Sequence, residues 1–365
     1  MSKVYFTDFR ATFDENLLQK LHRLLKTADF ESIDFNNKFV ALKLHFGEPG
    51  NVAYLRPNYI KVVADYIKQL NGRPFLTDSN TLYVGRRKNA LDHIEAAYEN
   101  GFNPFTTGCH VIIADGLKGH DEKLVPINQK HVKEAKIGRA VMDADVFVSI
   151  THFKGHENTG FGGAIKNIGM GCGSRGGKME MHYAGKPRVK SYKCVSCGVC
   201  YQNCAFGAIS FVDKKAVIDV DKCVGCGRCI GSCNYDAIAP IDSSSNVILN
   251  EKMAEYTYAV LKDRPQFHIS LITDVSPFCD CHSENDAPIV PNIGMLASFD
   301  PVALDQACAD LVNEAPVNPN SMLAEVEQVH DDHFTNISPD ADWQTCLAHA
   351  EKIGVGKREY ELLTI

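Results

Sequence analysis

Two cysteine runs give the sequence its most specific chemical signal. Residues 194–204 read CVSCGVCYQNC and residues 223–233 read CVGCGRCIGSC, so both have the spacing C-x2-C-x2-C-x3-C. Equivalent positions such as Cys194 and Cys223 lie 29 residues apart, which indicates an internal duplication. The spacing is typical of bacterial ferredoxin segments that bind two [4Fe–4S] clusters. A zinc ribbon fits less well, because it uses two CxxC pairs without a third cysteine at the same interval.

The repeat also predicts which cysteines share a cluster. In a two-cluster ferredoxin, the fourth cysteine of each run binds the cluster of the other run. We therefore expect one cluster on Cys194, Cys197, Cys200 and Cys233, and the other on Cys223, Cys226, Cys229 and Cys204. Such clusters would exchange electrons with a donor or acceptor protein.

A second pair of cysteines, Cys279 and Cys281, lies in the stretch PFCDCHSE. Three interpretations are open: thiolate ligation of a metal or substrate, a purely structural turn, and redox chemistry. Alternate residues of an extended segment point the same way, so both sulfurs could face one ion. We expect an additional metal ion or a substrate there, with further ligands from a set of four residues: His152, His156, Cys172 and His182.

Residues 151–182 combine nine glycines, eight of them in 160–177, with basic side chains and histidines. Glycines suit a loop whose backbone amides surround an anion, although neither GxxxxGK[ST] nor a Rossmann GxGxxG motif occurs. We expect the anionic ligand to be held by Gly160, Gly162, Gly163, Lys166 and Arg175. The expected catalytic groups are His45, His152, His156, Lys166 and His182.

The elements that must position these residues alternate between strands and helices. Apolar runs at 39–46, 75–79, 110–116, 145–152 and 268–275 read as strands, and Pro57 and Asp300-Pro301 open helices. This alternation predicts an α/β fold with a mostly parallel sheet flanked by helices. Polar residues at the ends of several strands, among them His45, Asp78 and His152, predict a shared cleft at one edge of the sheet.

The cysteine repeat interrupts this pattern as an insertion. We expect α/β sequence at 1–187, an α+β two-cluster ferredoxin-like module at 188–242, and the rest of the α/β domain at 243–365.

Composition narrows the class of protein. The 365 residues carry a net charge of −7 and contain 14 cysteines, and no apolar run is long enough to span a membrane. Without a secretory leader, so many cysteines point to metal rather than to disulfides, and we expect a cytoplasmic protein. An acidic chain without a nucleic-acid-binding motif is not expected to bind nucleic acid.

Several stretches together resemble a known family. KLHFGEPGN, TDSNTLYVGRR, HFKGHENTGFGGAIKNIGMGCGSRGGK, CDC and SFDPVALDQACADL are similar to domain-of-unknown-function family 362, in its branch with an inserted ferredoxin module. The resemblance covers essentially the whole chain. It implies an α/β protein of bacteria and archaea, many of them anaerobic, with iron–sulfur centres and no agreed reaction.

Two functions remain open from the sequence. The first is an oxidoreductase, or a component of one, that passes electrons from two clusters to a substrate or metal in the cleft. The second is a non-enzymatic carrier that delivers a metal, a cluster or electrons to a partner protein. The sequence contains no nicotinamide or flavin fingerprint.

Overall fold

A computed structural model describes residues 1–82, 85–182, 186–223, 225, 228–233, 235, 237–240 and 246–365. Its centre is an eight-stranded sheet in the order β16-β1-β15-β14-β7-β2-β3-β4. The strands are β1 (Ser2–Asp8), β2 (Phe39–Lys43), β3 (Arg73–Asp78), β4 (Val111–Ile113), β7 (Val146–His152), β14 (Gln266–Ile272), β15 (Gly294–Ser298) and β16 (Tyr360–Thr364). All neighbours are parallel except that β15 runs antiparallel to both β1 and β14. The predicted mostly parallel α/β class is therefore confirmed.

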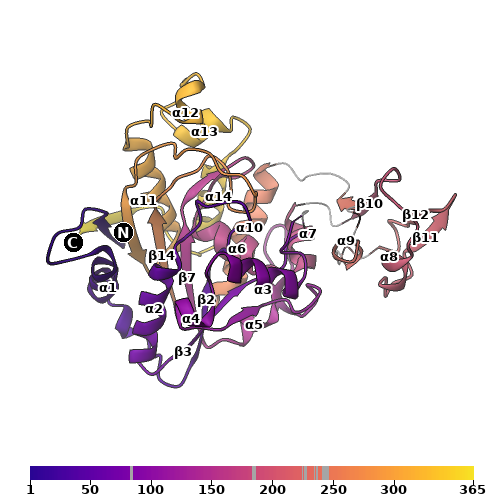
Figure 1. Cartoon of the computed structure of the whole chain (residues 1–365), viewed down its shortest axis with the longest axis horizontal. Coiled ribbons are helices and arrows are strands. Elements are labelled where there is room, and N and C mark those ends of the chain that lie inside the picture. The colour runs from indigo at the N-terminus through magenta and orange to yellow at the C-terminus, as the bar shows by residue number, and fades with distance from the viewer. Residues whose placement is uncertain are drawn as a thin grey trace.

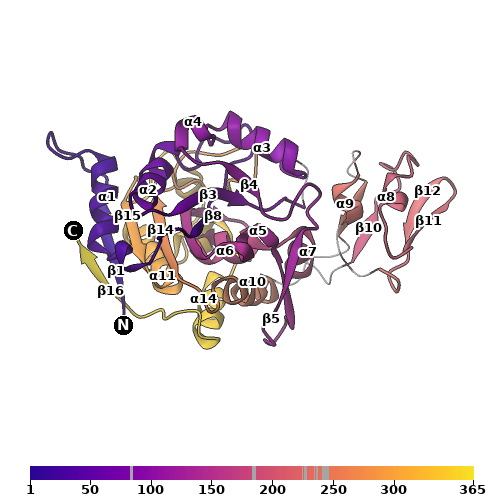
Figure 2. The same cartoon turned by 90° about the horizontal axis from the view of Figure 1, so that it is seen from below.

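Helices cover both faces of this sheet (Figure 2). One layer contains α1 (Leu17–Thr27), α2 (Pro57–Gln69), α3 (Ala90–Glu99) and α4 (Pro104–Thr107). The other contains α6 (Ala164–Cys172), α10 (Asn246–Leu261), α11 (Pro301–Glu314) and α14 (Trp343–Lys352). Shorter elements are η1 (Phe30–Ser32), α5 (Arg139–Asp143), α7 (Arg175–His182), α12 (Met322–Glu325), α13 (His333–Ile337), and the hairpins β5 (Glu122–Pro126)–β6 (Glu134–Gly138) and β8 (Lys154–His156)–β9 (Gly160–Gly162).

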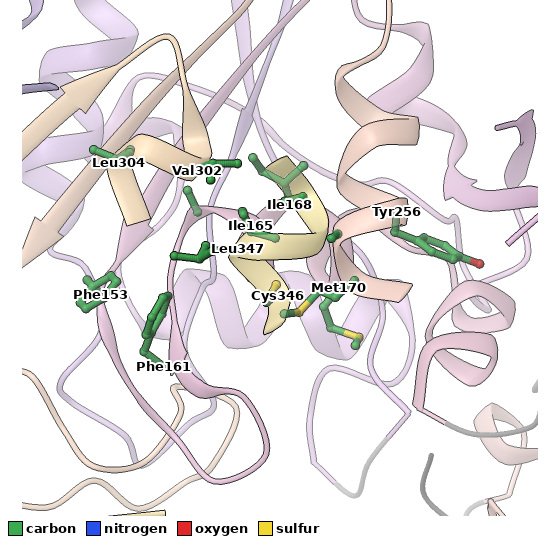
Figure 3. Close-up of a cluster of buried hydrophobic side chains, with 14 of the residues drawn as sticks. Phe153, Phe161, Ile165, Ile168, Met170, Tyr256, Val302, Leu304, Cys346 and Leu347 are labelled. Carbon is green, nitrogen blue, oxygen red and sulfur yellow. The ribbon is translucent and has the colours of Figure 1, made fainter. Parts of the chain in front are cut away.

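Each face of the sheet has its own hydrophobic core because side chains alternate along a strand. Val146 and Val148 of β7 belong to the core under α1 and α2, whereas Phe147 belongs to the core under α6 and α10. In the second core, Ile165 and Ile168 of α6 lie among residues of α11 and α14 (Figure 3). Cys308 and Cys346 are buried in this core, and Cys109 in the other, as small apolar residues.

The glycine-rich stretch is not the loop that the sequence predicts. It forms the hairpin β8–β9 and the helices α6 and α7, and His152 and His156 lie at the ends of strands β7 and β8. A Cβ at Gly169 would lie 2.2 Å from the Met253 carbonyl oxygen of α10. Gly169 therefore lets α6 approach α10 closely, which is a packing function.

Helix α6 begins where a carboxylate from another helix receives its first N–H groups. Asp305 of α11 is fully buried and accepts hydrogen bonds from Ala164 N at 2.6 Å and Ile165 N at 2.9 Å. Gly163 has no side chain, and a Cβ there would lie 2.3 Å from Asp305 Oδ1. Asp305 thus serves as the N-cap that the local sequence of α6 lacks.

The cysteine runs lie in a segment whose elements recur. Strand β10 (Pro187–Val189), helix α8 (Val199–Gln202) and strand β11 (Ile209–Val212) are followed by β12 (Lys215–Ile218), α9 (Arg228–Gly231) and β13 (Ile238–Pro240). Helix α8 begins at residue 199 and α9 at 228, which is the 29-residue offset of the cysteines. β10 pairs with β13 and β11 with β12, so each two-stranded sheet takes one strand from each repeat. This segment extends from the α/β body beyond α7 (Figures 1 and 2).

Cys226 lies outside the described residues, and the proposed boundaries at 187/188 and 242/243 stay a prediction. Within the described part of the chain, no helix is long and apolar enough to cross a membrane.

The cap on α6 is testable. Asp305→Ala leaves two buried N–H groups without an acceptor, so we expect the free energy of unfolding to fall by about 1–3 kcal/mol. The measurement is urea unfolding followed by circular dichroism, with Glu314→Ala on the exposed side of the same helix as control. Equal unfolding midpoints for the two variants would contradict the cap.

Candidate active site

A cavity of about 670 Å³ opens at the carboxyl ends of the parallel strands. His45 and Glu48 follow β2, Asp78 ends β3, and His156 ends β8, while Lys166 projects from α6. Because parallel strands end at one edge, residues that are far apart in sequence meet there. The predicted cleft is therefore present in the α/β body.

Cys279 and Cys281 lie in this cavity, and their sulfurs lie with a ring nitrogen of His156 within 4.8 Å of one another. Cys279 is buried, and Lys166 Nζ donates to its Sγ at 3.3 Å. A hydrogen bond from Cys281 lowers the pKa of Cys279 well below its usual value; burial opposes this shift, and Lys166 adds to it. The pKa of Cys281 is raised well above its usual value because the Cys281 thiol donates a hydrogen bond to Cys279. These opposite shifts favour negative charge on Cys279, beside the Lys166 ammonium, and the proton on Cys281.

The hydrogen bonds of His156 decide how it can act on this pair. Its Nδ1 accepts N–H groups from Asn158 at 3.0 Å and Thr159 at 3.3 Å. Backbone N–H groups cannot become acceptors, so the proton of the neutral ring belongs on Nε2. A metal-binding histidine normally donates its second ring N–H to an oxygen, and His156 lacks that arrangement. The ring is set to donate a hydrogen bond to Cys279 rather than to hold a cation.

The two sulfurs converge because the segment turns, not because it is extended as the sequence predicts. Residues 280 and 281 form a turn in which His282 N donates to Cys279 O at 3.0 Å. Asp280 points away into the protein, where it is fully buried and accepts from His152 Nδ1 at 2.8 Å. Lys154 Nζ lies 3.4 Å from the other Asp280 oxygen. The turn is therefore anchored by the side chain between the cysteines.

A chain of buried charges forms the opposite wall. Arg87 contacts Glu48 Oε2 at 2.7 Å and His45 Nε2 at 2.8 Å, and Gly47 N faces His45 Nδ1 at 3.0 Å. Burial and the Arg87 cation lower the pKa of His45 well below its usual value, so the ring is neutral.

Lys43 continues this wall and pairs with Asp78 at 3.0 Å. Although burial opposes it, Lys43 and His93 hold the pKa of Asp78 well below its usual range.

The structure brings most of the predicted site residues together. The lining includes eight of them: His45, His156, Gly162, Gly163, Lys166, His182, Cys279 and Cys281. Burial lowers the pKa of His182 to about 3, so that ring is neutral.

Four predicted residues lie elsewhere. His152 is buried behind the turn, where its Nε2 contacts Thr273 O at 2.8 Å, so it positions Asp280 instead of facing the cavity. Arg175 is fully buried and donates to the backbone carbonyls of Lys118 and Lys88, so it holds α7 instead of an anion. Cys172 is enclosed in the core, where burial raises its pKa to about 11. Gly160 has a φ of +73° and lies against Trp343.

Lys43 and Arg87 are charged lining residues that the sequence prediction did not include. Lys43 lies within an apolar strand and Arg87 in a segment without strand or helix, so periodicity marks neither of them. The signal that could have found Lys43 is a lysine inside a buried strand, since such a charge requires a buried partner.

The anchor of the cysteine turn can be tested by mutation. Asp280→Asn leaves the buried Lys154 ammonium without its carboxylate, so we expect unfolding to become easier by about 3–5 kcal/mol. Denaturant midpoints measure this effect, and Asp286→Asn, at an exposed position of the same segment, is the control. The double variant Asp280→Asn/Lys154→Met should recover part of the loss; no recovery would show that the ion pair is not the cause.

The chain has similar solved structures but no matching curated protein. One similar solved structure is the lactate racemase apoprotein from Thermoanaerobacterium thermosaccharolyticum, with a TM-score of 0.44 and 11% identity over 87% of this chain. Another is a structural-genomics protein from Thermotoga maritima, with a TM-score of 0.41 and 12% identity over 81% of this chain. The match spans 58% of the length of each of these proteins.

The sequence itself gives a more specific match. The family model described as Domain of unknown function (DUF362) matches residues 40–310, from β2 into α11. That range contains the central-sheet strands β3, β4, β7, β14 and β15, the cysteine repeat, and the turn with Cys279 and Cys281. The chain therefore belongs to the DUF362 family.

Proposed function

We propose that the protein is an iron–sulfur oxidoreductase, or a component of one, that passes electrons from two [4Fe–4S] clusters to a substrate in the α/β cavity. The observation that carries this proposal is the duplicated strand–cysteine run–helix–strand segment, in which β10 pairs with β13 and β11 with β12. A pair of small sheets built from both repeats suits an exchange of the fourth cysteine between two clusters.

The surroundings of the cysteines support the predicted ligand sets. A small hollow is bounded by Cys194, Cys197, Cys200 and Cys233, which are the four residues assigned to one cluster. Backbone N–H groups point at sulfurs of both sets, from Ala216 to Cys194 at 3.5 Å and from Ala208 to Cys204 at 3.3 Å. Such hydrogen bonds favour thiolates over thiols and tune the potential of a cluster. Cys223, Cys229 and Cys204 would hold the second cluster together with Cys226.

The second cluster would be the one nearer to the cavity. Helix α9, which contains Cys229, lies between α7 and the rest of the segment (Figures 1 and 2). Leu82 lines the cavity. Leu82 also packs in the hydrophobic cluster that contains the cluster cysteines, and Met179 of α7 belongs to the same hydrophobic cluster. The buried side chain of Leu82 thus lies between the clusters, which are the expected source of electrons, and the cavity, which is their expected destination.

The first cluster would be the one that meets a donor or acceptor protein. Cys197 is exposed, and so are the neighbouring Tyr192 at 81% and Val195 at 54%. Exposed apolar side chains around a metal centre suit brief docking of a redox partner. The cytoplasmic location expected from the sequence would keep the remaining thiols reduced.

A carrier of metal ions is the second candidate. It is favoured by the group of His156, Cys279 and Cys281, which would offer one nitrogen and two sulfurs to a soft ion. Two contacts weigh against metal binding, because a bound metal would have to displace them. Backbone N–H groups donate to His156 Nδ1, and the Lys166 ammonium donates to Cys279 Sγ. A bound metal beyond the cluster irons that transfers to an apo-partner would favour the carrier.

The exchange of ligands between repeats makes a specific prediction. Cys204→Ala should remove or damage the cluster of Cys223, Cys226 and Cys229 and leave the other cluster intact. Iron and sulfide content of protein purified without oxygen should fall by about half, and EPR of the reduced variant should retain one normal [4Fe–4S] signal.

Cys109→Ala, a buried cysteine in the α/β body, is the matched control and should keep both clusters. Loss of the cluster of Cys194, Cys197 and Cys200 instead would show that the fourth cysteines do not exchange. Wild-type protein without iron and sulfide after anaerobic purification and reconstitution would refute the proposed function itself.

A further inference from the structure

Cys279 places its sulfur in the cavity, and electron transfer through the clusters does not require this sulfur. Cys279 is 1% exposed, lines the cavity, and is contacted by Lys166 Nζ at 3.3 Å. A thiolate beside a fixed ammonium is a better nucleophile at neutral pH than an ordinary cysteine thiol. The cavity admits a small molecule to this sulfur, since its volume of about 670 Å³ is in the range of ligand-binding pockets.

Proton donors are already in place around the sulfur. Cys281 hydrogen-bonds to Cys279, and the proton of neutral His156 belongs on the nitrogen that is not occupied by Asn158 N and Thr159 N. The Cys281 thiol can protonate a leaving thiolate, whereas the neutral His156 ring can only donate a hydrogen bond to the sulfur. Another cation, Lys178, also lines the cavity, where Gly173 O accepts its hydrogen bond at 2.7 Å.

We propose that Cys279 is a catalytic nucleophile that attacks a sulfur–sulfur bond of a small, carboxylate-bearing disulfide. In the first step, a bond forms between Cys279 Sγ and one substrate sulfur, the substrate S–S bond breaks, and the leaving thiolate takes a proton from the Cys281 thiol, which solvent then reprotonates. In the second step, two electrons and one proton cleave the mixed disulfide, which releases the second thiol and restores the Cys279 thiolate.

The number of electrons connects this chemistry to the rest of the protein. A [4Fe–4S] cluster releases one electron at a time, and two clusters release the pair that cleavage of one mixed disulfide consumes. This inference rests on the proposed function for its second step only; the first step needs no cluster. Lys166 pairs with the Cys279 thiolate, and Lys178 is the cation that remains for a substrate carboxylate.

The first experiment measures alkylation of the holoprotein by iodoacetamide at pH 7, with the modified cysteine identified by peptide mass spectrometry. Cys279 should react ahead of Cys281 and of the buried Cys172 and Cys346. Lys166→Met should slow alkylation of Cys279 by about tenfold or more, because removing the cation raises the thiol pKa. Lys123→Met, at an exposed position of β5, is the matched control and should leave the rate unchanged.

The second experiment uses 5,5′-dithiobis(2-nitrobenzoate), a disulfide with two carboxylates, as the probe. With oxidised clusters, the protein should release one thionitrobenzoate per Cys279 and retain the other as an adduct on this residue. With reduced clusters and no excess reductant, the adduct should be released as the cluster absorbance returns to its oxidised value. Cys279→Ser should abolish both events.

Cys204→Ala distinguishes the two proposals. This variant should still form the adduct on Cys279 but should not release it with the electron of its one remaining cluster. Clusters that are intact in a protein whose Cys279 forms no adduct would overturn the nucleophile. An adduct that forms in a protein without clusters would support the nucleophile and refute the electron source. A metal ion that blocks alkylation of both Cys279 and Cys281 until a chelator removes it would also overturn the inference.

Discussion

The buried carboxylate of Asp280 is the interaction on which the cavity depends. It lies between the two cysteines in sequence, yet it points into the protein toward His152 at the end of β7 and Lys154 at the start of β8. A buried charge is tolerated only with partners, so this carboxylate ties the turn to the central strand of the sheet. With Asp280 held inward, the turn brings Cys279 and Cys281 together at the cavity.

The same requirement for compensation organises the remaining walls. Lys43 with Asp78, Arg87 with Glu48, and Lys166 with Cys279 are neighbouring pairs of opposite charge. In a medium of low dielectric constant, each pair fixes the protonation state of its members, which explains neutral histidines beside ionised carboxylates and a thiolate. The cavity thus has groups that hold charge and separate groups that can donate a proton.

The cysteine repeat and the α/β body meet through packing rather than through a shared sheet. Leu82 and Met179 contact the apolar interior of the repeat, and Leu82 also lines the cavity. This arrangement would let the repeat be inserted into the fold without disturbing the order of strands. The chemical groups of the two parts are separate: the repeat carries the two cysteine runs, and the α/β body carries the cavity with Cys279 and Cys281.

The sequence alone determined the features that depend on local pattern. The spacing of the cysteine runs, the alternation of apolar strands with helices, and Pro57 and Pro301 at helix starts all follow from neighbours in the chain.

Only the tertiary structure decided which distant side chains meet. It showed that Asp305 caps α6, that Arg175 and Cys172 are buried away from the cavity, and that Arg87 and Lys43 line it. It also showed that the glycines of 160–177 serve close contacts of helices and strands. The reason is physical: a glycine or a buried charge takes its function from the group opposite it, and that group comes from elsewhere in the sequence.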